Sequence, residues 1–495
     1  MAVSVGTALA AVALDPAMAT PLHRQLYDAL RSAVLSGHLA PGMRLESTRS
    51  MAAELGVSRN TVMSAFEQLL AEGYLEGRVG AGTFVSRTLP DDALRARRSP
   101  PPASAPAPRQ RGVSHRGATL IGTPVTLAGA GTSRAFRPGM PAFDGFPFEE
   151  WSRYVARRWR NPATDLLGYG DAAGYRPLRE AIARHLAVAR GVRCDAGQVV
   201  IVAGSQQALD LAARVLLDPG DAVWIEEPGY LGARAALAAA GAKLVPVPVD
   251  AEGLDVAAGV ALQRAAAMAY VSPSHQYPLG VTMSLSRRLA LLEWARAAGA
   301  WVLEDDYDSE YRYAGRPLAA LQGLDGDGRG IYLGTFSKVM LPSLRLGYLV
   351  LPPDLVDAFV AARAIADRHS PSVEQAALAD FIVDGQLDRH IRRMRMLYAE
   401  RQAAVVDAAK RELAGVLDVP ASDAGMHLVG WLPAGADDAE ASASAAANGV
   451  EAPPLSQYCI GAAERPGLVL GYAAVPADEA RAAVRRLAVA LGGKG

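Results

Sequence analysis

A lysine at the exit of a short Gly-Thr-Phe-Ser turn is the side chain best placed for covalent chemistry. It is Lys338, in the stretch IYLGTFSKVMLPSLRLGY. The hydroxyls of Thr335 and Ser337 and the guanidinium of Arg345 lie near it along the chain and together suit a phosphate dianion. Burial and nearby cations lower the pKa of a lysine, which makes it a nucleophile towards aldehydes. An aldehyde that carries a phosphate is pyridoxal 5′-phosphate (PLP), so we predict that Lys338 binds PLP.

PLP also needs an acidic partner for its pyridine nitrogen, because a protonated nitrogen makes the ring an electron sink. The run Glu-Asp-Asp-Tyr at residues 304–307 supplies carboxylates directly after an apolar segment. Carboxylates in such a place more often cap a helix or face solvent, and a lysine after an apolar run is often only a strand end. Whether Lys338 and the carboxylates at 304–307 form one site depends on the strands and helices that position them.

Seven apolar runs predict the strands of one large α/β domain over residues 135–495. They cover residues 199–202, 222–225, 244–247, 267–271, 301–303, 331–333 and 346–350. Most are separated by helical segments such as residues 287–298, a pattern typical of a largely parallel sheet that is buried on both faces. Ligands of such sheets bind beyond the carboxyl ends of the strands, so the polar residues there are the candidate site.

Three further strand ends carry residues that suit the same ligand. Gly204-Ser205-Gln206 opens a helix whose N–H groups and dipole attract phosphate. The run EEPGY places Tyr230 where an aromatic ring can stack on a flat cofactor, and SPSHQYPLG forms a loop after residues 267–271. Each signal is weak alone, but five strand ends in one order favour a single PLP site.

The N-terminal part has the pattern of a DNA-binding module. Apolar residues at i+4 spacing predict a helix that starts near residue 22 and ends at Gly37. Ser47 and Ser58 are predicted N-caps of two helices joined by a tight turn, and two short β-like pieces follow at residues 74–75 and 83–85. Paired helices occur in many proteins that never touch DNA, yet the added hairpin and the polar start of the second helix favour a winged helix-turn-helix.

Composition sets the remaining expectations. Residues 88–134 are rich in Pro, Ala, Ser and Arg without periodicity, which predicts an extended linker whose arginines either bind phosphate non-specifically or only solubilise it. With 50 basic and 51 acidic residues, the net charge of the chain gives no argument for binding to nucleic acid.

The cysteines and the N-terminal segment bear on the cellular compartment. Cys194 and Cys459 form no disulfide framework or metal-binding pattern, so we expect no metal and a reducing cytoplasm. The Ala-rich start lacks a positive segment and is expected to be an arm, not a signal peptide, and no apolar run is long enough to span a membrane.

Residues 21–85 closely resemble the winged helix-turn-helix of the gluconate-repressor (GntR) family, in the stretch LESTRSMAAELGVSRNTVMSAFEQLLAEGYLEGRVGAGTFV. This resemblance implies a domain over residues 15–87 that binds a double-stranded DNA operator. The implied DNA contacts are Arg49, Ser58, Arg59, Asn60 and Thr61 in the helices, and Arg78 and Gly80 in the wing.

The segments VAGSQQAL, EEPGY, SPSHQYPLG, LEDDYDSEY and GTFSKVMLPSLRLGY resemble the aminotransferase-like, fold-type I PLP domain. With the winged helix in front, the chain outside the linker resembles the MocR/GabR family of bacterial transcriptional regulators, a multidomain architecture. The resemblance implies Lys338 as the Schiff-base lysine and Asp305 as the partner of the pyridine nitrogen. It further implies Tyr307 at the ring hydroxyl, Tyr230 on the ring face, a phosphate cup of Ser205, Gln206, Thr335, Ser337 and Arg345, and Tyr169 at the phosphate of a neighbouring subunit.

The implied function is regulation of transcription by a head-to-tail homodimer. An amine or amino-acid effector, or PLP itself, would be sensed by aldimine exchange at Lys338 and would change how the winged helices sit on DNA. The alternative is an active aminotransferase with a DNA-binding appendage, and whether the chain turns over as an enzyme stays open.

Two positions depart from the family pattern. Aminotransferases carry Asn before the Pro of the loop, but here Tyr277 precedes it, so His275 or Gln276 is expected to substitute. The GABA-responsive family member has an arginine where this chain has Ala474, which argues against GABA as the effector. Arg234 either takes over the carboxylate-binding role of that arginine or is a surface residue.

Overall fold

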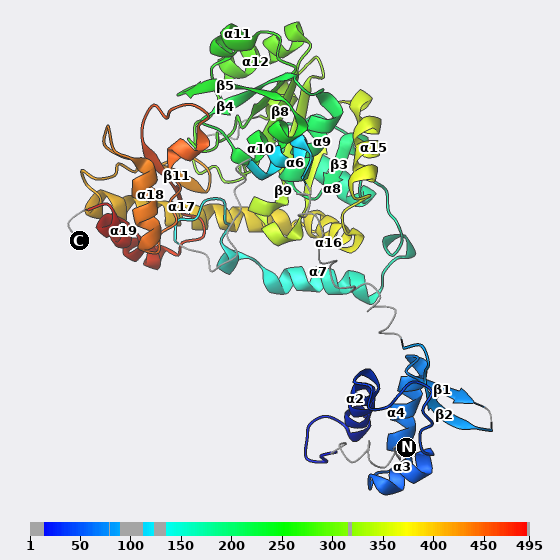
Figure 1. Ribbon diagram of the computed structural model, residues 1–495. Coiled ribbons are helices and arrows are strands. Elements are labelled where there is room, and N and C mark those ends of the chain that lie inside the picture. Colours follow the sequence, from blue (N-terminus) through cyan, green and yellow to red (C-terminus); the bar gives the residue numbers. More distant parts are fainter. Residues whose placement is uncertain (1–13, 79, 90–111, 123–134, 315–318, 493–495) are drawn as a thin grey trace. The chain divides into compact units, whose positions relative to one another are not determined.

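The computed structural model describes residues 14–78, 80–89, 112–122, 135–314 and 319–492. The chain divides into two compact units, Met1–Gly112 and Val113–Gly495 (Figure 1). The predicted N-terminal arm falls on residues 1–13 and lies outside the described residues.

The first unit is a three-helix bundle with a β-hairpin, as the sequence predicts. Its elements are α2 (Leu22–Leu35), α3 (Thr48–Glu54), α4 (Arg59–Ala71), β1 (Leu75–Arg78) and β2 (Gly82–Val85). Both predicted N-caps are confirmed, because the Ser47 hydroxyl accepts from the Ser50 amide and the Ser58 hydroxyl from the Thr61 amide, each at 3.1 Å. Leu89 is buried against the core of this unit, two residues beyond the predicted boundary.

A short helix interrupts the segment that was expected to be an extended linker. It is α6 (His115–Gly122), and the Ser114 hydroxyl caps it by accepting from the Gly117 amide at 3.1 Å. Residues 90–111 and 123–134, the rest of the predicted linker, lie outside the described part of the chain.

The second unit is built on an eight-stranded sheet with the order β3-β10-β9-β8-β7-β4-β5-β6. The strands are β3 (Val199–Val202), β4 (Ala222–Glu227), β5 (Lys243–Asp250), β6 (Gly253–Leu254), β7 (Met268–Val271), β8 (Trp301–Asp306), β9 (Gly330–Thr335) and β10 (Gly347–Val350). Neighbours pair in parallel from β5 through β9, whereas β10 is antiparallel to both its neighbours and β6 is antiparallel to β5. The predicted, largely parallel sheet is confirmed.

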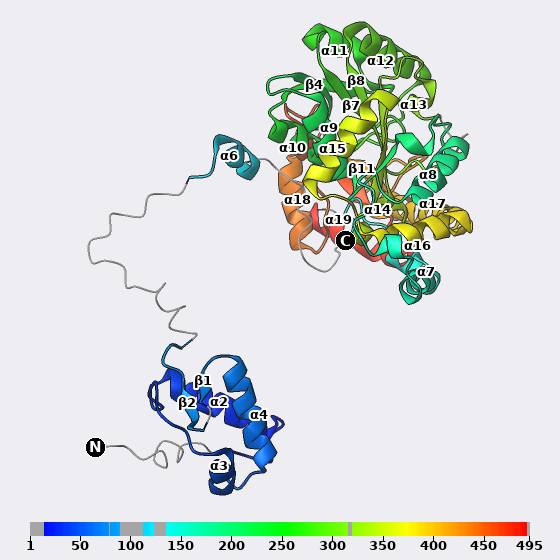
Figure 2. The ribbon, with the colours of Figure 1, turned by 90° about the vertical axis from the view of Figure 1, so that its right-hand side faces the viewer.

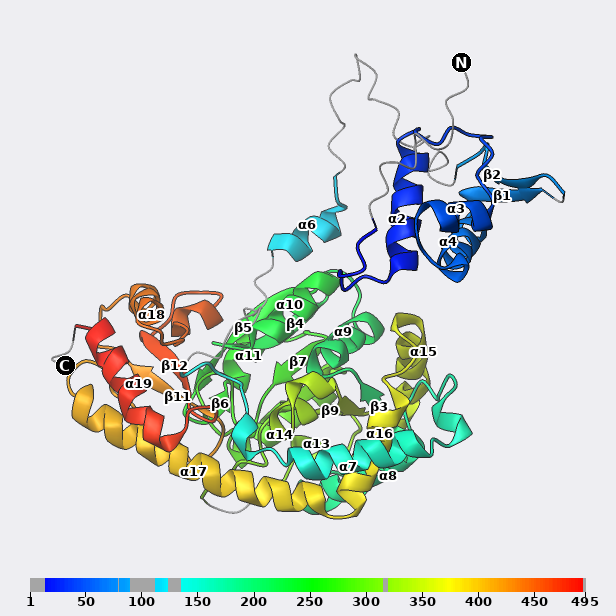
Figure 3. The same ribbon diagram turned by 90° about the horizontal axis from the view of Figure 1, so that it is seen from below.

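Helices cover both faces of this sheet. On one face α9 lies between α10 and α15, and the other face carries α8 and α16 at one end and α11 and α12 at the other (Figures 2 and 3). Their bounds are α8 (Arg176–Ala189), α9 (Ser205–Leu216), α10 (Leu231–Ala240), α11 (Val256–Gln263), α12 (Leu285–Ala298), α15 (Val356–Ala366) and α16 (Ser372–Val383). Both faces of β3 are buried, because Val200 and Val202 pack towards α9 while Val199 and Ile201 pack towards α8.

The C-terminal part forms a smaller subdomain with its own core. The 27-residue α17 (Gln386–Glu412) runs from the sheet to this subdomain (Figure 3). Further elements outside the large sheet include α7 (Phe148–Arg160), β11 (His427–Trp431), α13 (Leu321–Leu324), α18 (Asp438–Ala447), β12 (Gly467–Gly471) and α19 (Ala477–Ala490). No helix in the described part of the chain is long and apolar enough to cross a membrane.

β8 continues to Asp306, three residues beyond its predicted end at residue 303. The charged residues stay in the strand because each finds a buried partner. The Asp306 carboxylate accepts from Arg190 Nε at 2.8 Å and from the Tyr332 hydroxyl at 2.6 Å. Arg190 also donates to the Ser274 hydroxyl at 2.6 Å, so this ion pair fastens the loop after β7 to the end of β8.

Removing the arginine of this buried ion pair is expected to destabilise the second unit strongly. Arg190→Met leaves the Asp306 carboxylate buried without its cation, a change that costs about 3–5 kcal/mol of unfolding free energy. The matched control is Arg153→Met, which breaks an exposed pair with Glu149 and should cost less than about 1 kcal/mol. Urea unfolding followed by tryptophan fluorescence measures both, and equal losses in the two variants would contradict the assignment.

Candidate functional site

A cavity of about 380 Å³ opens beyond the carboxyl ends of the parallel strands, where the sequence predicts a ligand. Its walls come from the strand ends, from the segment before α7 and from the C-terminal subdomain. The lining includes all predicted cofactor residues except Tyr169 and His275, namely Ser205, Gln206, Tyr230, Asp305, Tyr307, Thr335, Ser337, Lys338 and Arg345.

Lys338 lies in α14 (Phe336–Val339), the single helical turn that directly follows β9. Its Nζ donates to the Gly139 carbonyl oxygen at 2.7 Å. Burial lowers the pKa of Lys338, although Asp308 and Asp305 act in the opposite direction. A lysine with a lowered pKa spends more time as the free amine, which is the form that attacks a carbonyl carbon.

Asp305 lies at the end of β8 and keeps one oxygen available to the cavity. Its Oδ2 accepts from the Tyr270 hydroxyl at 2.7 Å, while its buried Oδ1 has no hydrogen-bond partner among the described residues. Burial raises the pKa of Asp305 to about 7. A buried carboxylate oxygen of this kind needs a donor, and a protonated ring nitrogen in the cavity would provide one.

The start of α9 is an anion-binding end of the cavity. Gly204, which precedes the helix, has a φ of 110° that only glycine adopts easily, and a Cβ there would lie 3.4 Å from Nη1 of Arg345. The guanidinium is therefore close to the free N–H groups at the helix N-terminus, a combination that suits a phosphate. Ser337 and Thr335 line the same cavity, and the Ser337 amide donates to the Thr335 hydroxyl at 3.2 Å.

Tyrosine rings form an aromatic wall. The ring of Tyr277 contacts Tyr230, Tyr307 and Tyr458 edge to face, with centroid separations of 5.9, 6.0 and 5.4 Å. The Tyr277 and Tyr458 hydroxyls are 3.1 Å apart. These rings suit a flat, aromatic ligand.

Neither expected substitute for the loop Asn reaches the cavity. The Gln276 side-chain amide donates to the Glu226 carboxylate and to the backbone oxygens of Pro228 and Tyr277. The His275 ring contacts the Tyr307 hydroxyl and does not line the cavity. Because the Gln276 side chain is held by the buried Glu226, it does not turn towards the cavity. Tyr277, the next residue, lines the cavity wall.

Two further residues with predicted binding roles, Tyr169 and Arg234, do not line the cavity. Tyr169 is 83% exposed, and the guanidinium of Arg368 lies 4.6 Å from its ring centroid. Arg234 is half-buried on α10, where it donates to the Cys459 carbonyl oxygen at 3.0 Å. The cation that the sequence did not single out is Arg137, which lines the cavity and lies 3.4 Å from the Glu451 carboxylate.

In the first unit, the predicted DNA contacts fall on two surfaces. Arg49, Arg59 and Asn60 are exposed near the starts of α3 and α4, and Arg59 Nε lies 3.5 Å from the Thr48 hydroxyl. The Ser58 hydroxyl is occupied by capping and by a 2.9 Å contact with the Thr61 hydroxyl. Helix starts that present basic and polar side chains match a recognition surface.

The wing carries the second surface. Arg78 pairs with Glu76 at 2.6 Å and stacks on the Phe84 ring, and Gly80 turns the hairpin with a φ of 74°. Arg44 was missed by the sequence reasoning. Its backbone pairs with Phe84, and its guanidinium lies beside Gly82, so it adds a cation to the wing.

Other residues of the cavity were also missed, for identifiable reasons. Tyr270 lies inside β7 rather than after it, and Gly139 contributes only a backbone oxygen. His427 begins β11 in the C-terminal subdomain, far from the strand ends in sequence. A position directly after a predicted strand is the pattern that identifies most of the cavity residues, and none of these three has it.

Known families match the two units separately. The family "Aminotransferase class I and II" matches residues 140–487, and "Bacterial regulatory proteins, gntR family" matches residues 22–85. Aminotransferases of this class share a PLP-dependent fold. In solved structures, the kynurenine aminotransferase of Pyrococcus horikoshii, in complex with PMP, KYN and KYA, is 31% identical, with a TM-score of 0.68 over 73% of this chain and 91% of that protein.

Relatives of almost the same length carry both parts. The probable rhizopine catabolism regulatory protein MocR of Rhizobium meliloti is 44% identical over 96% of this chain and 94% of that protein. The pyridoxine biosynthesis transcriptional regulator PdxR of Corynebacterium glutamicum is 31% identical over 97% and 99%. The chain is therefore a MocR-type member of the GntR family, a DNA-binding transcriptional regulator in which a winged helix-turn-helix is fused to a fold-type I aminotransferase domain.

Proposed function

We propose that the cavity holds PLP bound to Lys338 and that an amine or amino acid displaces this lysine to change operator binding. The observation that carries the proposal is the convergence of three groups on one cavity. They are a buried amine with a lowered pKa, a buried carboxylate oxygen without a donor, and a helix N-terminus with an arginine beside it.

Each group has a stated task in this proposal. PLP supplies an electrophilic carbonyl and an electron-withdrawing ring. Asp305 holds the ring nitrogen in its protonated form, and Arg345 with the start of α9 binds the phosphate. Tyr230 and Tyr277 contact the ring system, and Tyr307 donates to the ring oxygen. Lys338 would supply the amine that holds the cofactor at its carbonyl carbon, and an effector amine would compete for that position.

Regulation requires that the effector bind two arrangements of the protein unequally. The cavity is suited to this, because His427 and Glu451 of the C-terminal subdomain line it together with strand ends of the large sheet. Filling it would change how the two parts pack. We further propose that two subunits pair head to tail, with Tyr169 reaching the partner's cofactor, and that the protein acts on DNA in the cytoplasm.

PLP itself is the second candidate signal. The Corynebacterium relative is named a regulator of pyridoxine biosynthesis, and the phosphate-binding residues of the cavity suit PLP as a reporter of its own supply. The remaining alternative is an aminotransferase with a DNA-binding appendage. It is favoured by the lysine and acid of the cavity, but the aminotransferase loop Asn is replaced by Tyr277 and a carboxylate-binding arginine by Ala474.

Replacing the lysine tests the cofactor assignment. Lys338→Ala should abolish the near-visible absorbance of lysine-bound PLP and weaken PLP binding roughly 100-fold, because the covalent link is lost. Lys243→Ala, which removes an exposed lysine of β5 outside the cavity, is the control and should keep both. An unchanged absorbance band in Lys338→Ala would overturn the assignment.

Removing one arginine of the α4 surface tests the DNA contact. Arg59→Ala should weaken binding to the DNA that the wild-type protein selects from a random pool by about tenfold, without a change in PLP content. Arg24→Ala removes the same charge from α2, where it pairs with Asp28 at 3.5 Å, and serves as the matched control. Gel shifts measure the DNA affinity of both variants. An equal loss of affinity in the two would show only the effect of removing one positive charge, and would contradict a specific contact by Arg59.

An absorbance titration against a panel of amines and amino acids separates sensor from enzyme. For a sensor, one compound shifts the absorbance of bound PLP while keto-product stays below one molecule per site. Accumulation of keto-product over many turnovers, once a keto-acid acceptor is added, would make the chain an aminotransferase. A panel without any shift would favour PLP as the signal.

A further inference from the structure

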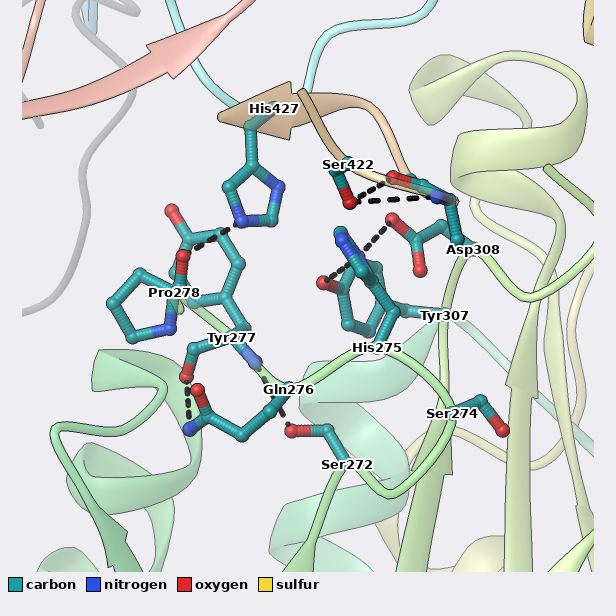
Figure 4. Close-up of polar contacts among 12 residues, drawn as sticks. Ser272, Ser274, His275, Gln276, Tyr277, Pro278, Tyr307, Asp308, Ser422 and His427 are labelled. Carbon is teal, nitrogen blue, oxygen red and sulfur yellow. Dashed lines mark hydrogen bonds and ion pairs between the residues drawn. The ribbon is translucent and has the colours of Figure 1, made fainter. Parts of the chain in front are cut away.

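A polar cluster lies next to Tyr307. Tyr307 lines the cavity, whereas His275, which contacts its hydroxyl, and Asp308, which contacts His275, do not. Figure 4 shows the Tyr307 hydroxyl and the Asp308 carboxylate meeting the same nitrogen of the His275 ring. His275 Nδ1 is 3.0 Å from the Tyr307 oxygen and 3.0 Å from Asp308 Oδ2. His275 and Asp308 are each 1% exposed, so water does not compete for these contacts.

The surroundings of the ring decide which nitrogen carries the proton. Nε2 of His275 is buried and has no hydrogen-bond partner among the described residues. An N–H group at that place would lose its hydrogen bond to water without replacement, which is costly. At Nδ1 a proton has the Asp308 carboxylate as acceptor. The neutral ring is therefore protonated at Nδ1, and Asp308 selects this tautomer.

This tautomer fixes the direction of the Tyr307 hydrogen. A protonated Nδ1 has no lone pair, so the Tyr307 oxygen can only accept from it. The hydrogen of the Tyr307 hydroxyl is then left for another acceptor, and the cavity is where such an acceptor can lie. With the proton on Nε2 instead, Nδ1 would take the tyrosine hydrogen and the cavity would lose a donor.

Two glycines hold the ring in this orientation. A Cβ placed at Gly425 would clash with Cε1 of His275, and one at Gly280 would lie 3.1 Å from Nε2. Both glycines have positive φ, at 93° and 74°, so a side chain at either position is doubly disfavoured. The ring fills the space that these backbones leave.

A metal ion is the competing explanation for this cluster. His275, Asp308 and His427 place potential ligand atoms within 4.8 Å of one another. However, His427 Nε2 is engaged with the Pro278 carbonyl oxygen at 2.9 Å, and His275 Nδ1 with Asp308. Each ring thus has a single nitrogen left, which is poor for a structural site that needs four ligands.

We propose that His275 and Asp308 are positioning residues that turn the hydroxyl of Tyr307 towards the cavity, where it donates to the ring oxygen of the cofactor. This inference rests on the proposed PLP site and assigns His275 a role through Tyr307 in place of the direct cofactor contact expected from the loop. Other titratable groups face the three residues. They are Glu226, Tyr277, Asp305, Asp306, Lys338 and His427.

The pH titration of bound PLP measures this role. A hydrogen-bond donor to the ring oxygen of the cofactor reduces the negative charge on that oxygen. The oxygen then stabilises the proton on the Lys338 nitrogen less, so this nitrogen loses its proton, and the absorbance changes, at a lower pH. His275→Phe and Asp308→Asn should each raise the pH midpoint by about 0.5 to 1 unit, and Tyr307→Phe by at least as much. His185→Phe, which breaks a second His–Asp pair with Asp388 outside the cavity, should leave the midpoint unchanged.

A double-mutant cycle separates a role through Tyr307 from a general disturbance. In the Tyr307→Phe background, His275→Phe should shift the midpoint no further. Additive shifts, or unchanged midpoints in both single variants, overturn the inference, as does a stoichiometric metal ion in the purified protein. Nitrogen-15 NMR of the cofactor-free protein should find His275 protonated at Nδ1, and Nε2 protonation also overturns it. A wild-type protein that binds no PLP at all would instead be a failure of the proposed function.

Discussion

The burial of several carboxylates at one end of the sheet is the constraint on which the second unit depends. Glu304, Asp305, Asp306 and Asp308 are all at most 4% exposed, so each needs a compensating group. Glu304 accepts from the amides of Leu321 and Gln322, Asp306 has Arg190, and Asp308 has His275. Asp305 is the one of these four that lines the cavity, and it has a phenol in place of a cation. Among the described residues, Asp305 and Asp306 each keep one buried oxygen without a hydrogen-bond partner, and of these two only Asp305 lines the cavity.

That arrangement links distant segments of the chain. Lys338 is tied to the Gly139 backbone before α7, and His275 is packed against Gly425, next to the start of β11. The cavity therefore draws on the N-terminal edge of the unit, the large sheet and the C-terminal subdomain. Bonding of Lys338 to a carbonyl ligand would remove its contact with Gly139, between the first and second of these parts, and release of the lysine would allow that contact again. Such differential contacts are the physical requirement for coupling an effector to a distant surface.

Much of this layout could be predicted from the sequence, because it follows from local patterns. Continuous apolar runs predicted the seven main strands, and Ser47 and Ser58 marked two helix starts. Residues at strand ends, such as Asp305 and Lys338, gather at the cavity because parallel strands end on one side of the sheet. The features that were not predicted depend on tertiary partners. β8 extends to Asp306, whose carboxylate is held by Arg190 and Tyr332, and the sequence of α17 does not indicate that the helix connects two cores.

The loop between β7 and α12 shows why residue types alone mislead. His275 and Gln276 were equally good substitutes for an asparagine by their chemistry. Neither side chain lines the cavity, because Gln276 is hydrogen-bonded to the buried Glu226 and His275 to the buried Asp308. A tyrosine then fills the wall in their place. In the proposed arrangement, His275 therefore acts on the cofactor only through the hydroxyl of Tyr307, which lies 3.0 Å from its Nδ1. His275 and Asp308 are shielded from solvent, since each is 1% exposed.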